Sequence, residues 1–178
     1  MADINQFKQK YASFVSTFKL TSYDSNNDIY LCKDETQEVI NFDKIIETKY
    51  PDSNIRPKAF DALYFDENTN RIYLIEFKNE KKPDKKEIEG KLIDGRNEFS
   101  ILLNELHISS KNYTYIFCLV YNQFKPKEER FKRGLYKSIR FEFLNRYKNI
   151  GLIDEVFTED ISFFSQQFKK NFQKELMC

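Results

Sequence analysis

The chain has 178 residues, of which 40% are hydrophobic and 32% are charged, so it can bury a core and wholesale disorder is excluded. This length predicts one domain, 1–178, and argues against a two-domain protein. The formal net charge of +1 hides an uneven distribution, because basic residues outnumber acidic ones between Lys111 and Lys148.

The first part of the chain predicts two amphipathic helices. Apolar residues recur at spacings of three and four in 4–18 and again in 36–50, as they do on one face of a helix. A polar, turn-rich segment and a short apolar piece at 29–32 separate the two. We expect each helix to pack one face inward.

A β-hairpin is predicted in the middle of the chain. The runs 60–65 and 72–77 are short, aromatic and β-branched, and the turn-forming sequence 67–70 lies between them. Strands of this kind present alternate side chains to opposite faces of a sheet.

Three further elements are predicted after the hairpin. Segment 88–106 has the spacing of a long amphipathic helix, in which Gly90 or Gly95 is expected to mark a close approach to backbone or ligand. The apolar run 113–121 is typical of a central strand buried on both faces, and 161–176 predicts a terminal helix. This order predicts an α/β fold with a mixed β-sheet flanked by helices.

The sequence also excludes several kinds of site. It contains no GxGxxG and no GxxxxGK[ST], so nicotinamide and P-loop nucleotide chemistry have no support. Cys32, Cys118 and Cys178, with a single histidine, cannot build a zinc finger or a four-cysteine iron–sulfur cluster. Three scattered cysteines argue against a disulfide framework, and Cys118 is expected to be a buried thiol.

The location of the protein is predicted from two missing patterns. The N-terminus lacks a signal-peptide pattern, and no run approaches the roughly 18 apolar residues of a membrane span. Together with the cysteine usage, this predicts a cytoplasmic protein with no membrane partner.

Three charged residues stand out in the hairpin, where strands are usually apolar. Glu76 and Lys78 point to the same face because a strand has a period of two, and Asp61 lies across from the end of that strand. Two carboxylates and an ammonium group should therefore converge. Buried charges need partners or a metal, and this set suits a magnesium ion. The alternative is a surface salt-bridge cluster.

Asp61, fourteen intervening residues and then Glu76-Phe77-Lys78 resemble the core motif of the PD-(D/E)XK nuclease superfamily. The resemblance implies a restriction-endonuclease-like αβββαβ core at about 36–121, with added N- and C-terminal helices. The remainder, about 122–178, is expected to be a basic helical C-terminal extension.

The resemblance further implies a metal-dependent deoxyribonuclease. Asp61 and Glu76, with the backbone carbonyl of Phe77, would hold magnesium or manganese against the scissile phosphate. Lys78 would orient or deprotonate the attacking water and offset charge in the transition state. Cleavage would leave a 5′-phosphate and a 3′-hydroxyl. Many relatives cut both strands as dimers, which makes a homodimer possible.

Many members of the superfamily carry a further glutamate on the first core helix. Glu38, Asp43 and Glu47 are available on the predicted helix 36–50. Glu47 is taken as the catalytic one because it is closest to the hairpin in sequence, with Glu38 next, but the choice among the three stays open.

A basic stretch is expected to follow the DNA backbone. Its residues are Lys125, Lys127, Arg130, Lys132, Arg133 and Lys137. The alternative for this stretch is a solvated helical face. The alternative for the whole protein is a catalytically weak or inactive nuclease-fold protein that acts as a nucleic-acid-binding or interaction module.

Overall fold

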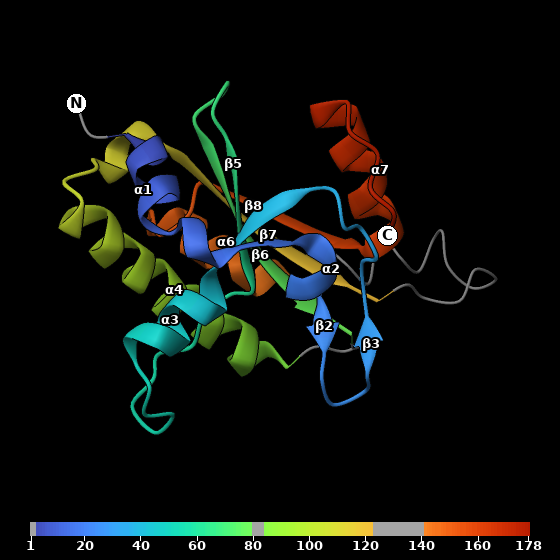
Figure 1. The fold of residues 1–178 in the computed structure, drawn as a ribbon, viewed down its shortest axis with the longest axis horizontal. Coiled ribbons are helices and arrows are strands. Elements are labelled where there is room, and N and C mark those ends of the chain that lie inside the picture. Colours follow the sequence, from blue (N-terminus) through green and yellow to red (C-terminus); the bar gives the residue numbers. More distant parts are fainter. Residues whose placement is uncertain (1–2, 80–83, 123–140) are drawn as a thin grey trace.

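The computed structural model describes residues 3–79, 84–122 and 141–178, built around a six-stranded mixed sheet (Figure 1). The strands are β1 (Val15–Thr17), β2 (Tyr23–Asp24), β3 (Ile29–Tyr30), β4 (Glu38–Asn41), β5 (Ala62–Asp66), β6 (Arg71–Lys78), β7 (Thr114–Tyr121) and β8 (Glu155–Asp160). The helices are α1 (Ile4–Lys10), α2 (Phe18–Thr21), α3 (Phe42–Lys49), α4 (Lys85–Glu105), α6 (Asn145–Asn149) and α7 (Ile161–Phe172). Short 3-10 turns lie at Ala12–Phe14, Ser110–Asn112 and Glu142–Leu144. None of the helices described here has both the length and the apolar character needed to cross a bilayer.

The sheet has the strand order β1-β4-β5-β6-β7-β8. The pairs β1–β4, β4–β5 and β5–β6 are antiparallel, whereas the pairs β6–β7 and β7–β8 are parallel. Helix α4 makes the crossover that a parallel pair needs between β6 and β7. The predicted class, an α/β fold with a mixed sheet flanked by helices, is therefore confirmed.

Both faces of the sheet are covered, and each has its own apolar core. Helices α1, α3 and α4 pack on one face, where Phe7, Phe42 and Phe99 are buried. Helices α2 and α7 pack on the other face, where Phe18 and Phe168 meet edge to face with ring centroids 5.5 Å apart. Burying each such ring stabilises the fold by about 1.5–3 kcal/mol.

The predicted hairpin is present with the expected geometry. Strands β5 and β6 pair antiparallel, with Ala62 opposite Ile75 and Asp66 opposite Arg71. The turn between them is closed by Asn70, whose φ of 53° lies in the left-handed region that asparagine tolerates better than most residues. The predicted helix at 88–106 and the predicted strand at 113–121 are also confirmed, as α4 and β7.

The prediction of a helix over 4–18 is wrong beyond Lys10. Residues 15–17 form β1, which pairs antiparallel with β4. The apolar spacing continues past Lys10 because the 3-10 turn at 12–14 keeps Phe14 near the face that α1 buries. The β-branched Val15 and Thr17 then favour an extended backbone.

The prediction of a helix over 36–50 is wrong in its first part. Residues 38–41 form β4, and α3 begins only at Phe42. Asn41 sets this boundary, because its side chain accepts a hydrogen bond from the backbone N–H of Lys44, 2.9 Å away, as an N-cap. The adjacent Val39 and Ile40 suit a strand better than a helix.

The C-terminal extension is not purely helical. Strand β8 runs parallel to β7 inside it, so the sheet reaches beyond the predicted core of 36–121. Asp160 ends β8 and caps α7 by accepting hydrogen bonds from the N–H groups of Ser162 and Phe163. The six residues of the basic stretch fall within 123–140, outside the described residues.

Two of the three cysteines are paired, although their scattered positions argue against a disulfide framework. Cys32 and Cys178 form a disulfide, whereas Cys118 is a free, buried thiol as predicted. The pair forms because the last residues run back beside β3: Lys33 donates its N–H to the Met177 carbonyl, 2.9 Å away. The two cysteines are brought together by the fold, so the spacing of cysteines in the sequence cannot predict this disulfide.

Thiol titration can check this arrangement. Burial raises the pKa of the Cys118 thiol, and the thiolate is the reactive form. We expect Ellman's reagent to find no reactive thiol in the native protein, one after denaturation without reductant and all three after reduction and denaturation. Rapid labelling of the native protein would contradict the burial of Cys118, and three thiols without reductant would contradict the disulfide.

Candidate active site

Alternation along the strands brings the three predicted residues to one face of the sheet. In β6, Ile72 and Leu74 belong to the core beneath α4, and Glu76 and Lys78 continue that series at the end of the strand. Asp61 directly precedes β5, where the ladder would place it opposite Glu76. Asp61, Glu76 and Lys78 therefore converge at one end of the hairpin, as predicted.

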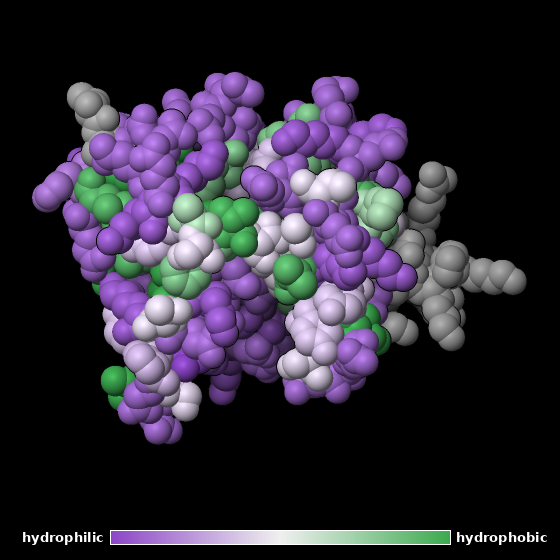
Figure 2. Space-filling model, in the orientation of Figure 1, coloured by the Kyte–Doolittle hydropathy of each residue, from purple (hydrophilic) through white to green (hydrophobic). Residues whose placement is uncertain are grey.

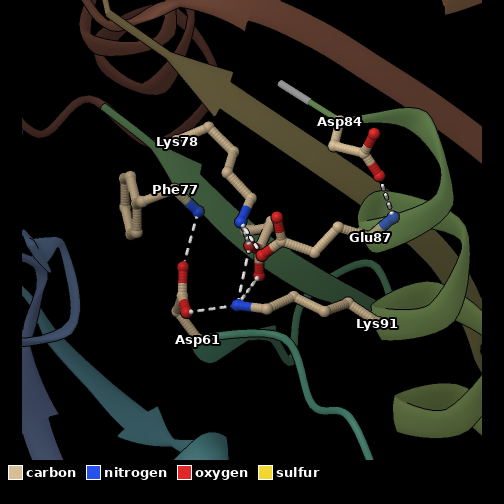
Figure 3. A network of polar contacts seen from close by, with 7 residues as sticks. Asp61, Phe77, Lys78, Asp84, Glu87 and Lys91 are labelled. Atoms are coloured by element: carbon tan, nitrogen blue, oxygen red, sulfur yellow. Dashed lines mark hydrogen bonds and ion pairs between the residues drawn. The ribbon is translucent and has the colours of Figure 1, made fainter. Parts of the chain in front are cut away.

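Asp61 is fixed by hydrogen bonds at both its backbone and its side chain. Its carbonyl accepts a hydrogen bond from the N–H of Phe42, 3.1 Å away. Its carboxylate Oδ2 accepts another from the N–H of Phe77, 2.6 Å away (Figure 3). The side chain thus continues the β5–β6 pairing one residue before the start of β5. Phe77, whose carbonyl is the predicted metal ligand, holds Asp61 in place through its N–H.

Glu76 is a fully buried carboxylate. Its Oε1 lies 3.1 Å from the ammonium nitrogen of Lys78 and 2.8 Å from that of Lys91. Despite these ion pairs, Oε1 accepts no hydrogen bond of regular geometry from the described residues. Burial raises the pKa of Glu76 to about 8, and the charge of Asp61 adds to this, although Lys91 and Lys78 act in the opposite direction. Two ammonium groups therefore leave this carboxylate incompletely compensated.

Lys91 is a member of the site that the sequence analysis does not include. It reaches in from α4 and places its Nζ 3.3 Å from Asp61 Oδ1 and 3.1 Å from Glu76 Oε2 (Figure 3). Desolvation lowers the pKa of Lys91, but the charges of Glu76 and Asp61 outweigh it and raise the pKa overall. The sequence spacing indicates that Lys91 points inward, because it lies three residues after Ile88 and four before Gly95, on the buried face of α4.

Lys78 is held as a cation between two elements. Its ammonium pairs with Glu76 of its own strand and with Glu87 from the first turn of α4 (Figure 3). Asp84 caps that helix by accepting a hydrogen bond from the N–H of Glu87, 2.8 Å away. Desolvation lowers the pKa of Lys78, but Glu76 and Glu87 raise it above its usual value overall.

The helix carboxylate that interacts with this cluster is Asp43. Asp43 is exposed at the surface of α3, but partial burial of its carboxyl group and the charge of Asp61 raise its pKa while Lys91 lowers it, so Asp43 lies within electrostatic range of the cluster. Glu47, the predicted catalytic residue, forms ion pairs with Lys44 and with Arg56 instead.

Glu38, the next choice, does not belong to a helix. It is an exposed residue of β4 and lies opposite Thr17 of β1. Its prediction as a helix carboxylate is wrong because the helix begins only after Asn41.

A polar cleft of about 340 Å³ opens onto the cluster. Asp61, Lys78 and Lys91 line one side, and the β2–β3 hairpin with its turn lines the other. Asn79 fixes this wall, because it donates a hydrogen bond to Asp24 of the hairpin and accepts one from Asn122 after β7. Figure 2 shows a hydrophilic hollow between this hairpin and the α3 side of the molecule. Asp61, Lys78 and Lys91 are therefore accessible from solvent, whereas Glu76 is fully buried and does not line the cleft.

The site offers two carboxylates to a metal ion. Within 3–79, 84–122 and 141–178, no cluster of three or more His, Cys, Asp and Glu side chains could hold a metal. A magnesium ion, however, often binds one or two carboxylates and fills its remaining positions with water and substrate phosphate. Asp61 and Glu76 fit such an ion, because both share one cation already and Glu76 Oε1 is buried without a hydrogen bond.

Close packing at Gly95 holds α4 against the site. A Cβ at this position would lie 2.7 Å from the ring of Phe60, the neighbour of Asp61. We expect Gly95→Ala to lower the free energy of unfolding by about 1–2 kcal/mol, since overpacking outweighs the gain in helix propensity. Gly90→Ala is the matched control, because its Cβ would meet only the flexible side chain of Lys58. Urea denaturation measures both, and a Gly95→Ala variant as stable as Gly90→Ala would contradict the close packing.

The raised pKa of Glu76 predicts a pH dependence of stability. The carboxyl group titrates near 4.5 in the unfolded chain and near 8 in the folded one, so the folded state retains a proton that the unfolded chain releases. Its contribution to stability is therefore complete below pH 4.5 and is lost as the pH rises to about 8. In the metal-free parent, the free energy of unfolding should fall by up to about 1.4 kcal/mol per pH unit over this range. We expect metal-free Glu76→Gln to lack this fall. Urea titrations in EDTA measure the difference, and equal slopes would refute it.

Comparison with known proteins identifies no relative of this chain. No family model, no curated protein and no solved structure matches it.

Proposed function

We propose that the protein is a metal-dependent deoxyribonuclease of the PD-(D/E)XK type. The observation that carries the proposal is the cluster at the cleft: Asp61 and a fully buried Glu76 share one cation beside Lys78. Burying these charges is costly, and a site that binds a metal and a phosphate gives a reason for it.

The sheet topology also supports the proposal. Strands β4, β5 and β6 form an antiparallel series, and α4 then leads to the parallel strand β7. This resembles the order of the restriction-endonuclease-like core with α1 in the place of its first helix, whereas α3 is inserted between β4 and β5. Asp61 directly precedes the second strand of that series, and the ExK sequence ends the third.

Each residue of the cluster has a role in the proposed hydrolysis. Asp61 and Glu76, with the Phe77 carbonyl, would hold magnesium or manganese at the floor of the cleft. The ion, when bound, would polarise the scissile phosphate and lower the pKa of a bound water. Asp43 lies within electrostatic range of the same cluster and would add negative charge near it from α3.

Lys78 acts in this proposal as a cation and a hydrogen-bond donor. Its raised pKa keeps it protonated at neutral pH, so of the two expected roles it suits orientation of the water better than deprotonation. A fixed positive charge at this position also stabilises the charge that develops on the phosphate in the transition state. Glu87 limits the freedom of the ammonium group by pairing with it from α4.

One observation favours the second candidate function, an inactive nuclease-fold protein that binds nucleic acid or a partner. Lys91 already pairs with Asp61 and Glu76, so the cluster has internal charge partners without any metal. Under this alternative, the cleft would remain and the hydrolysis would not.

Cleavage assays with single variants separate these functions. We expect the parent protein to cut labelled DNA with magnesium or manganese and to stop when EDTA is added. Lys78→Met should slow cleavage about 100-fold or more, because it removes a charge from the transition state. Glu76→Gln should also abolish cleavage, since it removes a metal ligand.

Lys86→Met is the matched control, because Lys86 is an exposed lysine in the first turn of α4. It should cut as fast as the parent. A Lys78→Met variant as fast as Lys86→Met would show that the role given to Lys78 is wrong. A parent protein that binds DNA but never cuts it would support the inactive alternative.

A further inference from the structure

Lys91 lies where the two carboxylates of the site meet. Its ammonium nitrogen is 2.8 and 3.1 Å from the two oxygens of Glu76 and 3.3 Å from Oδ1 of Asp61. These are the same two carboxylates that the proposed function assigns to a divalent ion. The ammonium group therefore occupies the place between the two carboxylates where the divalent ion would bind.

The two lysines of the site are held differently. Lys78 divides its ammonium between Glu76 and Glu87, and Glu87 is not one of the proposed metal ligands. Lys91 instead pairs with Asp61 and Glu76 together. Loss of those two partners would leave Lys78 with Glu87, but it would free the ammonium of Lys91.

Lys91 also has room to move. About a fifth of its side chain is exposed, and it lines the polar cleft. Its side chain has a long, flexible aliphatic part and starts from a residue well inside the length of α4. The ammonium group can therefore turn into the cleft while the helix stays in place.

We infer that Lys91 is a tethered cation that occupies the metal position in the metal-free protein and leaves it when a divalent ion binds. The inference rests on the proposed function, because it takes Asp61 and Glu76 as the metal ligands. Two cations repel each other at such short range, so the ion and the ammonium group cannot both keep these partners. Lys91 therefore stabilises the metal-free fold and weakens metal binding, and once displaced it presents a positive charge to the cleft.

Isothermal titration of manganese alone into the full chain tests this inference. We expect Lys91→Met to bind manganese about 10- to 100-fold more tightly than the parent, the range by which groups around a metal site commonly change its affinity. Lys91→Arg keeps the charge, and we expect it to bind manganese no more tightly than the parent. Lys86→Met, which removes a charge from the same helix, should leave the affinity unchanged.

Thermal unfolding with and without manganese provides the second measurement. We expect Lys91→Met to unfold at a lower temperature than the parent in EDTA and to regain that loss in manganese. A lysine with only a structural role would give the same loss in both conditions and no gain in affinity, which would overturn the inference. If Lys91→Met does not fold, a Lys91→Arg variant that binds manganese more tightly than the parent would overturn it.

The remaining outcomes distinguish this inference from the proposed function. Equal manganese affinity in the parent and in Lys91→Met would refute the role of Lys91 and leave the nuclease proposal standing. Binding to Lys91→Met alone would support the role of Lys91 and refute metal dependence of the parent. Absence of binding in every variant would refute both.

Discussion

The buried carboxylate of Glu76 is the constraint on which the rest of the site depends. A charge without solvent contact in the core face of a sheet is unfavourable unless cations approach it closely. Lys78 and Lys91 provide them from a strand and a helix, respectively, and both must be held at about 3 Å. Their positions in turn fix where α4 lies over β6.

The packing around α4 supplies this precision. At Gly95 the missing side chain lets the helix approach Phe60, and Phe60 directly precedes Asp61. At the other end, Asp84 caps the helix and Glu87 pairs with Lys78. The two lysines consequently reach the same carboxylate from a strand and from a helix, and that carboxylate is fully buried next to the apolar core.

The sequence reveals the parts of the site that follow from local geometry. The period of a strand puts Glu76 and Lys78 on one face, and the hairpin register puts Asp61 opposite. Lys91 joins them through the docking of a helix, which no spacing within the hairpin can predict. The apolar spacing of 36–50 is continuous across the boundary between β4 and α3, so it predicts a single helix, and only the cap at Asn41 marks the change. Strand β8 lies between the helices α6 and α7, in a part of the chain where the pattern predicts helices only.

The disulfide has a topological consequence for the whole molecule. Cys32 and Cys178 are separated by 146 positions, so their bond closes a covalent ring that contains strands β4 to β8. Closing a ring of this size lowers the conformational entropy of the unfolded chain. In the chain-entropy treatment this raises the free energy of the unfolded state by about 5 kcal/mol. The ring closes directly after the β2–β3 hairpin, which forms one wall of the cleft. When the oxidised chain unfolds, residues 32–178 therefore remain a closed loop. The segment that forms the β2–β3 hairpin stays attached to this loop next to the disulfide.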